Sequence, residues 1–363
     1  MPHLFDPITL RGATLRNRIG VSPMCQYSST DGYATDWHLV HLGSRAVGGA
    51  ALVTAEATAI EPRGRISPHD LGIWDAGHIE MLARIAHFVE AHGAVPGIQL
   101  AHAGRKASRN RPWDPERNIP ETEGGWPIVG PSAIPFGQGW QVPHALTAGE
   151  IRGLLVAVEA AVRRALDAGF GWVELHAAHG YLCHSFYSPL SNAREDEYGG
   201  TFENRIRFTI QMVRSIRRVW PEERPLSVRL SCTDWVEGGW ALEDTVALAR
   251  ALRGEGVDII DCSSGGNVLA PIPVGAGYQV PFAETVRRQA GVATAAVGLI
   301  TEPAHADEIV RNGRADMVLL AREELRDPYW PIHAARALRQ EQRVPAQYLR
   351  AFHGATRTTI HVK

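Results

Sequence analysis

The 363-residue sequence lacks an excess of either charge and contains only four cysteines. Lysine and arginine together number 37 and aspartate and glutamate 39, which gives a formal net charge of −2. A nucleic-acid-binding protein would show a basic surplus and a charged tail would show a run of one sign, and the sequence has neither. Four cysteines without a CxxC pair argue against a disulfide framework or a zinc ribbon and favour a reducing cytoplasm.

Long hydrophobic runs are also missing. The first 18 residues contain no apolar segment of the kind found in a signal peptide. No apolar run approaches the roughly 18 residues that a membrane-spanning helix needs. We therefore expect a cytoplasmic protein without nucleic-acid or membrane partners, whose hydrophobic content of 45% can fill a large core.

Short β-rich apolar runs alternate with amphipathic helical stretches along the whole chain. The runs cover residues 18–23, 50–57, 95–104, 171–179, 226–232, 257–265, 293–300 and 316–323. The clearest helical stretches cover residues 76–93, 147–169 and 242–256. Eight such units predict the α/β class and a (β/α)8 TIM barrel with a parallel sheet. A doubly wound fold would need a glycine-rich turn after its first strand, where residues 22–29 contain no glycine.

A long segment separates the third and fourth predicted strands. Residues 105–146 are rich in proline, glycine and tryptophan, and loops of this length are usually lids or functional insertions. We predict one domain over residues 1–363, with residues 105–146 forming a cap over the barrel mouth and residues 341–363 a C-terminal segment.

Each predicted strand ends in a chemically useful residue. In chain order these are Ser22, Cys25, Glu56, Gln99, His102, His176, His179, Arg229, Ser263, Gly298 and Arg322. Because the C-terminal ends of barrel strands share one face, where catalytic loops gather, we expect these side chains to form one site.

Residues 174–186 raise the question of which reaction needs His176, His179 and Tyr181 together. A zinc site could use both histidines with His102 as a third ligand, but the early-strand HxH pair that is usual in metal-dependent barrel hydrolases is absent. The histidines could also merely satisfy loop hydrogen bonds. A third interpretation is a pair of imidazole donors on a carbonyl oxygen, with the tyrosine protonating the adjacent carbon.

Reduction of a C=C bond conjugated to a carbonyl would suit that third arrangement, and its hydride must come from a cofactor. The loops after the last two strands commonly bind phosphate in this fold, and here they carry Gly298 and Arg322. A single terminal phosphate fits FMN. Arg229 could face the electron-rich edge of the flavin ring, and Gln99 offers both a donor and an acceptor to the ring.

Seven further motifs cover residues 22–28, 98–108, 174–182, 188–200, 203–208, 228–231 and 321–328. Together they resemble the Old Yellow Enzyme family of flavin-dependent ene-reductases. The similarity is greatest to a bacterial subgroup that has a cysteine in the first-strand loop and includes xenobiotic reductases, and it runs from about residue 3 to about residue 352.

The resemblance implies FMN as cofactor and NADPH or NADH as reductant. The residues implied to contact the flavin are Ser22, Pro23, Met24, Cys25, Ala57, Gln99, Arg229, Gly298, Ala321 and Arg322. The family often has glycine where this chain has Ala321, and the xenobiotic reductases have tryptophan where it has Val297, which leaves their substrate preferences open here.

The resemblance also implies a ping-pong reduction of enones, enals, maleimides or nitro compounds. His176 and His179 would bind the substrate carbonyl, Tyr181 would donate the proton and Tyr27 would add a hydroxyl to the pocket. Arg350 would reach the active site of a neighbouring subunit, in a homodimer or homotetramer. Two alternatives remain at this point: a metal-dependent barrel hydrolase and a non-catalytic flavin-binding barrel. The role of Lys106 is open.

Overall fold

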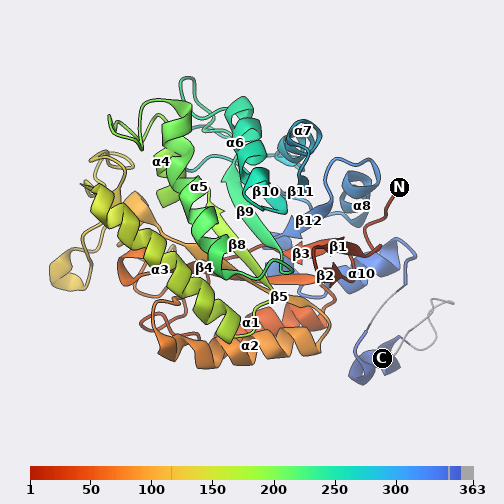
Figure 1. The fold of residues 1–363 in the computed structure, drawn as a ribbon. Helices are drawn as coiled ribbons and strands as arrows, with labels where there is room; N and C mark the ends of the chain where they lie inside the picture. The colour runs from red at the N-terminus through yellow and green to blue at the C-terminus, as the bar shows by residue number, and fades with distance from the viewer. Residues whose placement is uncertain (116, 342–343, 353–363) are drawn as a thin grey trace.

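The computed structural model describes residues 1–115, 117–341 and 344–352. Eight parallel strands close into a barrel in the order β10-β11-β12-β3-β4-β5-β8-β9 (Figure 1). Their bounds are β3 Ile19–Val21, β4 Leu52–Ala59, β5 Val95–Ala101, β8 Trp172–Ala177, β9 Leu226–Ser231, β10 Ile259–Ser263, β11 Ala293–Ala296 and β12 Met317–Leu320. Each of the eight predicted apolar runs supplies one of these strands, which confirms the predicted TIM barrel.

The barrel strands are buried on both faces, as parallel strands covered by helices must be. All eight residues of β4 and all six of β8 are buried. The register between β8 and β9 places His176 opposite Arg229. On β4 the register shifts between Ala55 and Ala57, so the ladder to β5 passes over Glu56. These registers determine which polar residues emerge together at the C-terminal end of the barrel.

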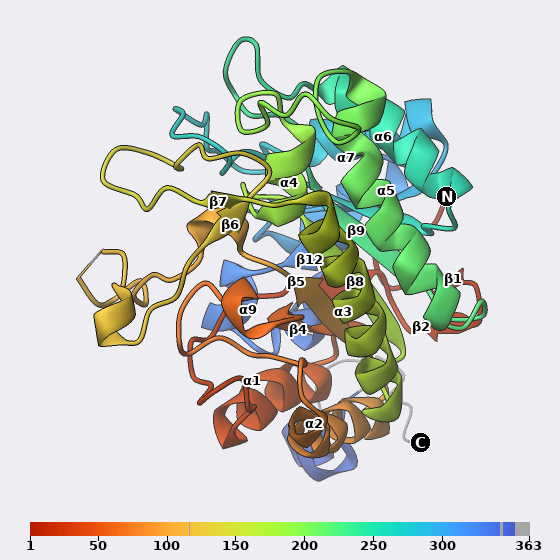
Figure 2. The ribbon, with the colours of Figure 1, turned by 60° about the vertical axis from the view of Figure 1, so that its left-hand side comes forward.

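Helices surround the barrel (Figure 2). Their bounds are α1 Asp36–Val47, α2 Ile79–Ala91, α3 Ala148–Asp167, α4 Leu182–Tyr187, α5 Phe202–Val219, α6 Leu242–Gly254, α7 Val280–Ala290, α8 Pro303–Arg311, α9 Arg322–Arg326 and α10 Trp330–Ala337. The three predicted helical stretches correspond to α2, α3 and α6. Helix α3 begins in a capping box, because Thr147 Oγ1 accepts from Glu150 N while Glu150 Oε2 accepts from Thr147 N.

Two features add to the barrel. The hairpin of β1 (Ile8–Leu10) and β2 (Ala13–Leu15), which the sequence did not reveal, packs Leu15 against residues at the N-terminal ends of the strands. Segment 105–146 contains only short elements, and its orange and yellow ribbon projects on one side of the molecule in both views (Figures 1 and 2). These elements are η4 Glu121–Glu123, β6 Val129–Gly130 and β7 His144–Ala145, preceded by η3 Gly104–Lys106. Within the part of the chain that the structure describes, no helix has the length and apolar character to cross a membrane.

Candidate active site

His176, His179 and Tyr181 lie together at the C-terminal end of β8. The ring centroids of His176 and His179 are 5.1 Å apart and those of His176 and Tyr181 4.8 Å apart, with each pair nearly perpendicular. A tight turn produces this cluster, because His179 and Gly180 have φ angles of 59° and 73°. A side chain at position 180 would place its Cβ 2.2 Å from Gly266 O, so only glycine fits there.

The His176 ring is held as a neutral hydrogen-bond donor. Its Nδ1 accepts a hydrogen bond from Ala178 N at 3.2 Å, so the proton of the neutral ring resides on Nε2. Burial, followed by the charge of Arg229, lowers the pKa of both His176 and His179 well below the ordinary value. His179 Nε2 lies 2.7 Å from Ser263 Oγ. Two uncharged imidazoles therefore stand side by side at the barrel mouth.

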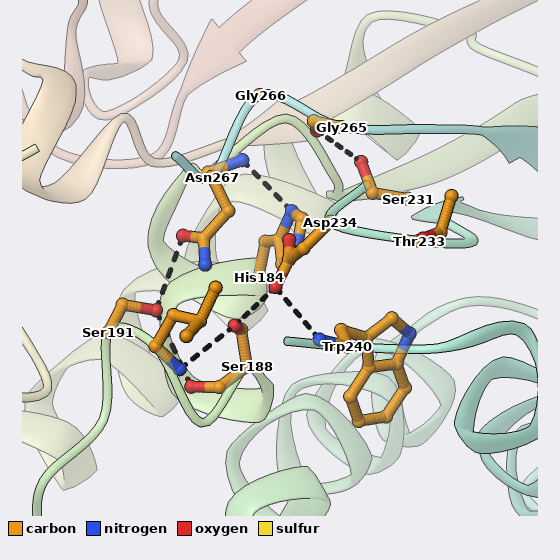
Figure 3. Close-up of polar contacts among 12 residues, drawn as sticks. His184, Ser188, Ser191, Ser231, Thr233, Asp234, Trp240, Gly265, Gly266 and Asn267 are labelled. Carbon is orange, nitrogen blue, oxygen red and sulfur yellow. Dashed lines mark hydrogen bonds and ion pairs between the residues drawn. The ribbon is translucent and has the colours of Figure 1, made fainter. Parts of the chain in front are cut away.

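A buried polar network supports the turn at His179 and Gly180 (Figure 3). Gly180 N donates to His184 Nδ1 at 3.0 Å, and His184 Nε2 lies 2.9 Å from Asp234 Oδ1. Asp234 Oδ2 accepts from Ser188 Oγ at 2.6 Å and from Trp240 N at 3.0 Å. Although this resembles a Ser-His-Asp triad in composition, the serine bonds to the aspartate and all three side chains are fully buried. The network is therefore a support for the turn, not a nucleophilic site.

The turn is also tied to the loop after β10. Ser231 Oγ accepts from His179 N at 2.9 Å and donates to Gly265 O at 2.8 Å, the latter bond being visible in Figure 3. Lys106 Nζ donates to His179 O at 2.8 Å and to Gly266 O at 3.0 Å. The position of the turn at His179 thus depends on residues after β5, at the end of β9 and after β10.

Cys25, Tyr27 and Tyr181 form a group of protonated donors beside the histidines. Burial raises the pKa of all three well above their ordinary values, so thiol and hydroxyls keep their protons at neutral pH. The Tyr27 hydroxyl interacts with the Cys25 thiol, and its ring meets Trp113 edge-on at 5.7 Å. Ala57 and Tyr181 line one small cavity.

A second cavity, of about 160 Å³, lies at the ends of β3, β9, β11 and β12. Five of the predicted cofactor residues line it: Ser22, Arg229, Gly298, Ala321 and Arg322. Pro23 and Met24, which continue from Ser22, are partly buried. A larger cavity of about 520 Å³ lies at the opposite end of the barrel, against β2 and α10, and contains no predicted site residue.

The residues around the smaller cavity suit FMN. Arg229 Nη1 donates to Ser22 Oγ at 2.9 Å, whereas its buried Nε makes no hydrogen bond within the described residues, although Asp261 Oδ2 lies 3.1 Å away. Gly298 has a φ of 113°, which leaves its backbone bare toward the cavity. A buried guanidinium, an exposed Arg322 and a bare glycine form a cradle for an anionic ligand.

Gln99 enters the barrel interior, where its Nε2 donates to Glu174 Oε1 at 2.8 Å. Ser227 Oγ donates to the other oxygen of Glu174 at 2.9 Å. Burial and the neighbouring Asp261 raise the pKa of Glu174 to about 7. The Gln99 nitrogen is therefore committed to Glu174, a partner that the sequence did not suggest.

The polar side-chain atoms of two candidate residues are not directed to this cluster, although the backbone of His102 accepts from Leu182 N at 3.0 Å. Arg350 is exposed on η5 (Ala346–Ala351), which is on the other side of the molecule from segment 105–146 (Figures 1 and 2). His102 Nε2 lies 2.9 Å from Glu61 Oε1 and its Nδ1 accepts from Gly104 N, so neither nitrogen is directed to the other histidines. Within residues 1–115, 117–341 and 344–352, no group of three His, Cys, Asp or Glu side chains could hold a metal ion.

The mouth of the TIM barrel thus places an anion-binding cradle near a cluster of neutral donors, an arrangement that suits an FMN-dependent oxidoreductase. Residues 3–341 match the family model described as the NADH:flavin oxidoreductase / NADH oxidase family. The chain is 48% identical to the NADPH dehydrogenase of Geobacillus sp. (strain WCH70), over 96% of this chain and 98% of the relative. It is 46% identical to the NADPH dehydrogenase of Bacillus subtilis (strain 168), over 96% and 99%. The chain therefore belongs to the NADH:flavin oxidoreductase / NADH oxidase family.

Solved structures agree with this assignment. The old yellow enzyme homologue from Zymomonas mobilis superposes with a TM-score of 0.77 at 26% identity, covering 99% of this chain and 95% of that one. Morphinone reductase in complex with tetrahydroNAD gives a TM-score of 0.77 at 25% identity, covering 96% and 94%. The predicted Old Yellow Enzyme resemblance is confirmed, together with the predicted oxidoreductase class, FMN as cofactor and a nicotinamide dinucleotide as reductant.

Proposed function

We propose that this chain reduces the C=C bond of α,β-unsaturated carbonyl compounds, such as enones, enals and maleimides, with NADPH or NADH as the reductant. The observation that carries the proposal is the cluster of neutral His176 and His179 with a protonated Tyr181 at one strand end. Such a cluster can bind an oxygen that becomes negative and supply a proton nearby. A ping-pong cycle, in which reductant and enone occupy the same pocket in turn, requires no separate dinucleotide-binding motif.

The residues proposed to hold FMN are those around the smaller cavity and along the first-strand loop. They are Ser22, Pro23, Met24, Cys25, Ala57, Gln99, Arg229, Gly298, Ala321 and Arg322. When bound, FMN would supply the hydride that the side chains lack. Gly298 and Arg322 would hold its phosphate, and Arg229 would lie at the edge of the ring.

The two histidines would bind the substrate oxygen. His176 donates through Nε2, because Ala178 N occupies Nδ1. His179 donates as well, and for this its Nε2 exchanges Ser263 Oγ for the substrate. Since both rings are neutral, they act as preorganised donors whose benefit grows as the oxygen gains charge, to about 3–4 kcal/mol for each donor.

Tyr181 would then protonate the α-carbon of the substrate through its hydroxyl. Its raised pKa keeps the proton in place until the carbon becomes basic. Tyr27 adds a second hydroxyl to the pocket, and segment 105–146, which supplies Trp113 against Tyr27, would cover the mouth and exclude water. We propose further that the C-terminal segment 341–363 brings Arg350 to a neighbouring subunit of a dimer or tetramer, which its exposed position permits. Residues 353–363 of that segment lie outside the described residues.

Isotope labelling during turnover tests the proposal. The FMN-loaded protein is given 2-cyclohexenone with NADPH deuterated at C4, and then with ordinary NADPH in D2O. We expect deuterium at the β-carbon in the first case and at the α-carbon in the second. FMN binding without NADPH oxidation would instead support the non-catalytic alternative, and stoichiometric zinc without flavin would support the hydrolase.

A further inference from the structure

Lys106 is an unusual residue in this chain. Lysine and arginine together number 37, yet Lys106 and Lys363 are the only lysines. Lys106 ends η3, directly after β5, and its Nζ donates to His179 O and Gly266 O. A chain that otherwise uses arginine therefore places a compact ammonium beside the catalytic turn.

The ammonium of Lys106 also faces two aromatic rings. Its Nζ lies 4.6 Å from the centroid of Phe136, in segment 105–146, and 5.2 Å from that of Tyr181. Within the described residues it has no carboxylate as an ion-pair partner. Burial, followed by the charge of Arg105, lowers its pKa to about 8, so it is still cationic at neutral pH. A largely buried cation is thus held by carbonyls and ring faces alone.

Proton donation by Tyr181 would leave a negative charge that a nearby cation can stabilise. The O–H bond of Tyr181 breaks as a C–H bond forms at the α-carbon, and the negative charge of the substrate enolate passes to the tyrosine oxygen. Burial makes that phenolate costly, since it raises the pKa of Tyr181 well above its ordinary value. Arg229 also acts on Tyr181 as a cation, but it already lies 3.1 Å from Asp261.

We propose that Lys106 is a positioning residue whose charge stabilises the negative charge left on Tyr181 after proton donation. The inference rests on the proposed function, because it assumes that Tyr181 is the proton donor. Its effect is confined to the step in which the substrate is protonated. A purely structural lysine would instead affect every reaction in the pocket equally.

A double-mutant cycle on the FMN-loaded full chain tests this idea. The variants are Lys106→Met, which keeps most of the length of the side chain but removes its charge, Tyr181→Phe, and the two together. Each protein is reduced anaerobically and reoxidised in a stopped-flow instrument by 2-cyclohexenone or by ferricyanide, which needs no proton from Tyr181. We expect Lys106→Met to slow the enone reaction by about tenfold to a hundredfold, to leave the ferricyanide reaction unchanged, and to add little in the Tyr181→Phe background.

Equal slowing with both oxidants, or the same loss with and without Tyr181, would overturn the inference and leave the proposed function standing. If ferricyanide reoxidises the reduced wild-type protein but no enone of a panel does so, the proposed function is wrong. The inference then fails with it.

Nuclear magnetic resonance of wild-type protein labelled with ε-13C-lysine gives a second test if Lys106→Met does not fold. The titratable and charged groups around the ammonium are Arg105, His176, His179, Tyr181 and His184. Only two lysine signals exist to assign. We expect Lys106 to be charged at pH 7 and to titrate near pH 8, in line with its pKa of about 8. A neutral Lys106 at pH 7 would overturn the inference, because there would be no cation to stabilise the phenolate.

Discussion

Gly180 donates its backbone N–H to Nδ1 of His184 at 3.0 Å, and this bond joins the 179–181 turn to the fully buried contact between His184 and Asp234. Because Nδ1 accepts, Nε2 of the neutral ring carries its proton toward Asp234. Burial lowers the pKa of His184, which keeps the ring neutral. Burial alone would raise the pKa of Asp234, but the contact with His184 and the hydrogen bonds from Ser188 and Trp240 outweigh it and lower the pKa. His179 and Tyr181 flank the bonded glycine, so their geometry depends on this pair.

Asp234→Asn is expected both to destabilise the protein and to disturb the 179–181 turn. The variant loses a buried charge that three groups contact, namely His184, Ser188 and the backbone N–H of Trp240. This loss should cost about 3 kcal/mol of unfolding free energy. Urea unfolding of the FMN-loaded protein measures this cost, and binding of a phenol, which mimics the enolate, reports on the turn. Glu195→Gln, at an exposed position, is the matched control. Normal stability with normal phenol affinity would contradict the role of the pair.

The barrel was predictable because its strands are buried on both faces and therefore appear as continuous apolar runs. The contacts of His184 and Asp234 that support the 179–181 turn could not be predicted. His184 lies on a six-residue helix, too short for helical periodicity to appear, and Asp234 lies in a loop after a different strand. Only folding brings these two residues within 2.9 Å.

The same contrast holds for the candidate site. Ser22, Arg229 and Gly298 could be predicted to converge because the C-terminal ends of barrel strands must meet, and the three residues do line one cavity. The contact of Lys106 with His179 depends on how η3 packs against the turn, which leaves no periodic signal in the sequence. The hydrogen bond between Glu174 and Gln99 could not be predicted, because the two residues lie on neighbouring strands that are far apart in the sequence.

Glu56→Gln should alter the pH dependence of stability. Burial raises the pKa of Glu56 to about 8, and its Oε1 accepts from Gln26 N at 3.0 Å. The folded chain thus keeps a proton on Glu56 that the unfolded chain loses above about pH 4.3. Between about pH 4.3 and the folded-state pKa of about 8, the free energy of unfolding falls by up to about 1.4 kcal/mol per pH unit. Glutamine keeps the acceptor and does not titrate, so the stability of the variant relative to wild type should rise from pH 5 to pH 8. Urea unfolding across this pH range measures the difference, with Glu90→Gln at an exposed position as the control. If the stability of Glu56→Gln and that of wild type change with pH in parallel, Glu56 is not protonated in the folded protein.

Cys25→Ala should shift the midpoint potential of bound FMN. The raised pKa of Cys25 keeps the thiol neutral, so it acts as a weak hydrogen-bond donor next to Tyr27. Loss of one such bond of about 1 kcal/mol corresponds to about 20 mV for a two-electron couple. Dye equilibration during anaerobic reduction measures the potential. Cys183→Ala, at a buried packing position, should leave it in place, and an unmoved potential in Cys25→Ala would take Cys25 out of the flavin site.

Arg350→Ala should weaken substrate binding only in the assembled protein. In the single chain Arg350 is exposed, so an effect on the enone must come through a neighbouring subunit. Loss of a charged hydrogen bond of about 1.5–3 kcal/mol predicts a rise in KM of roughly tenfold to a hundredfold with little change in kcat. Exposed Arg336→Ala is the control, and analytical ultracentrifugation establishes the assembly state. Unchanged kinetics in a confirmed oligomer would refute the shared role.

The separate half-reactions of Tyr181→Phe test the central claim most directly. The hydroxyl is absent from this variant while the ring that packs against His176 remains. Anaerobic stopped-flow measurements should show flavin reduction by NADPH near the wild-type rate, and reoxidation by 2-cyclohexenone slowed by about a hundredfold or more. Equal loss in both half-reactions, or full enone reactivity without the hydroxyl, would contradict proton donation by Tyr181.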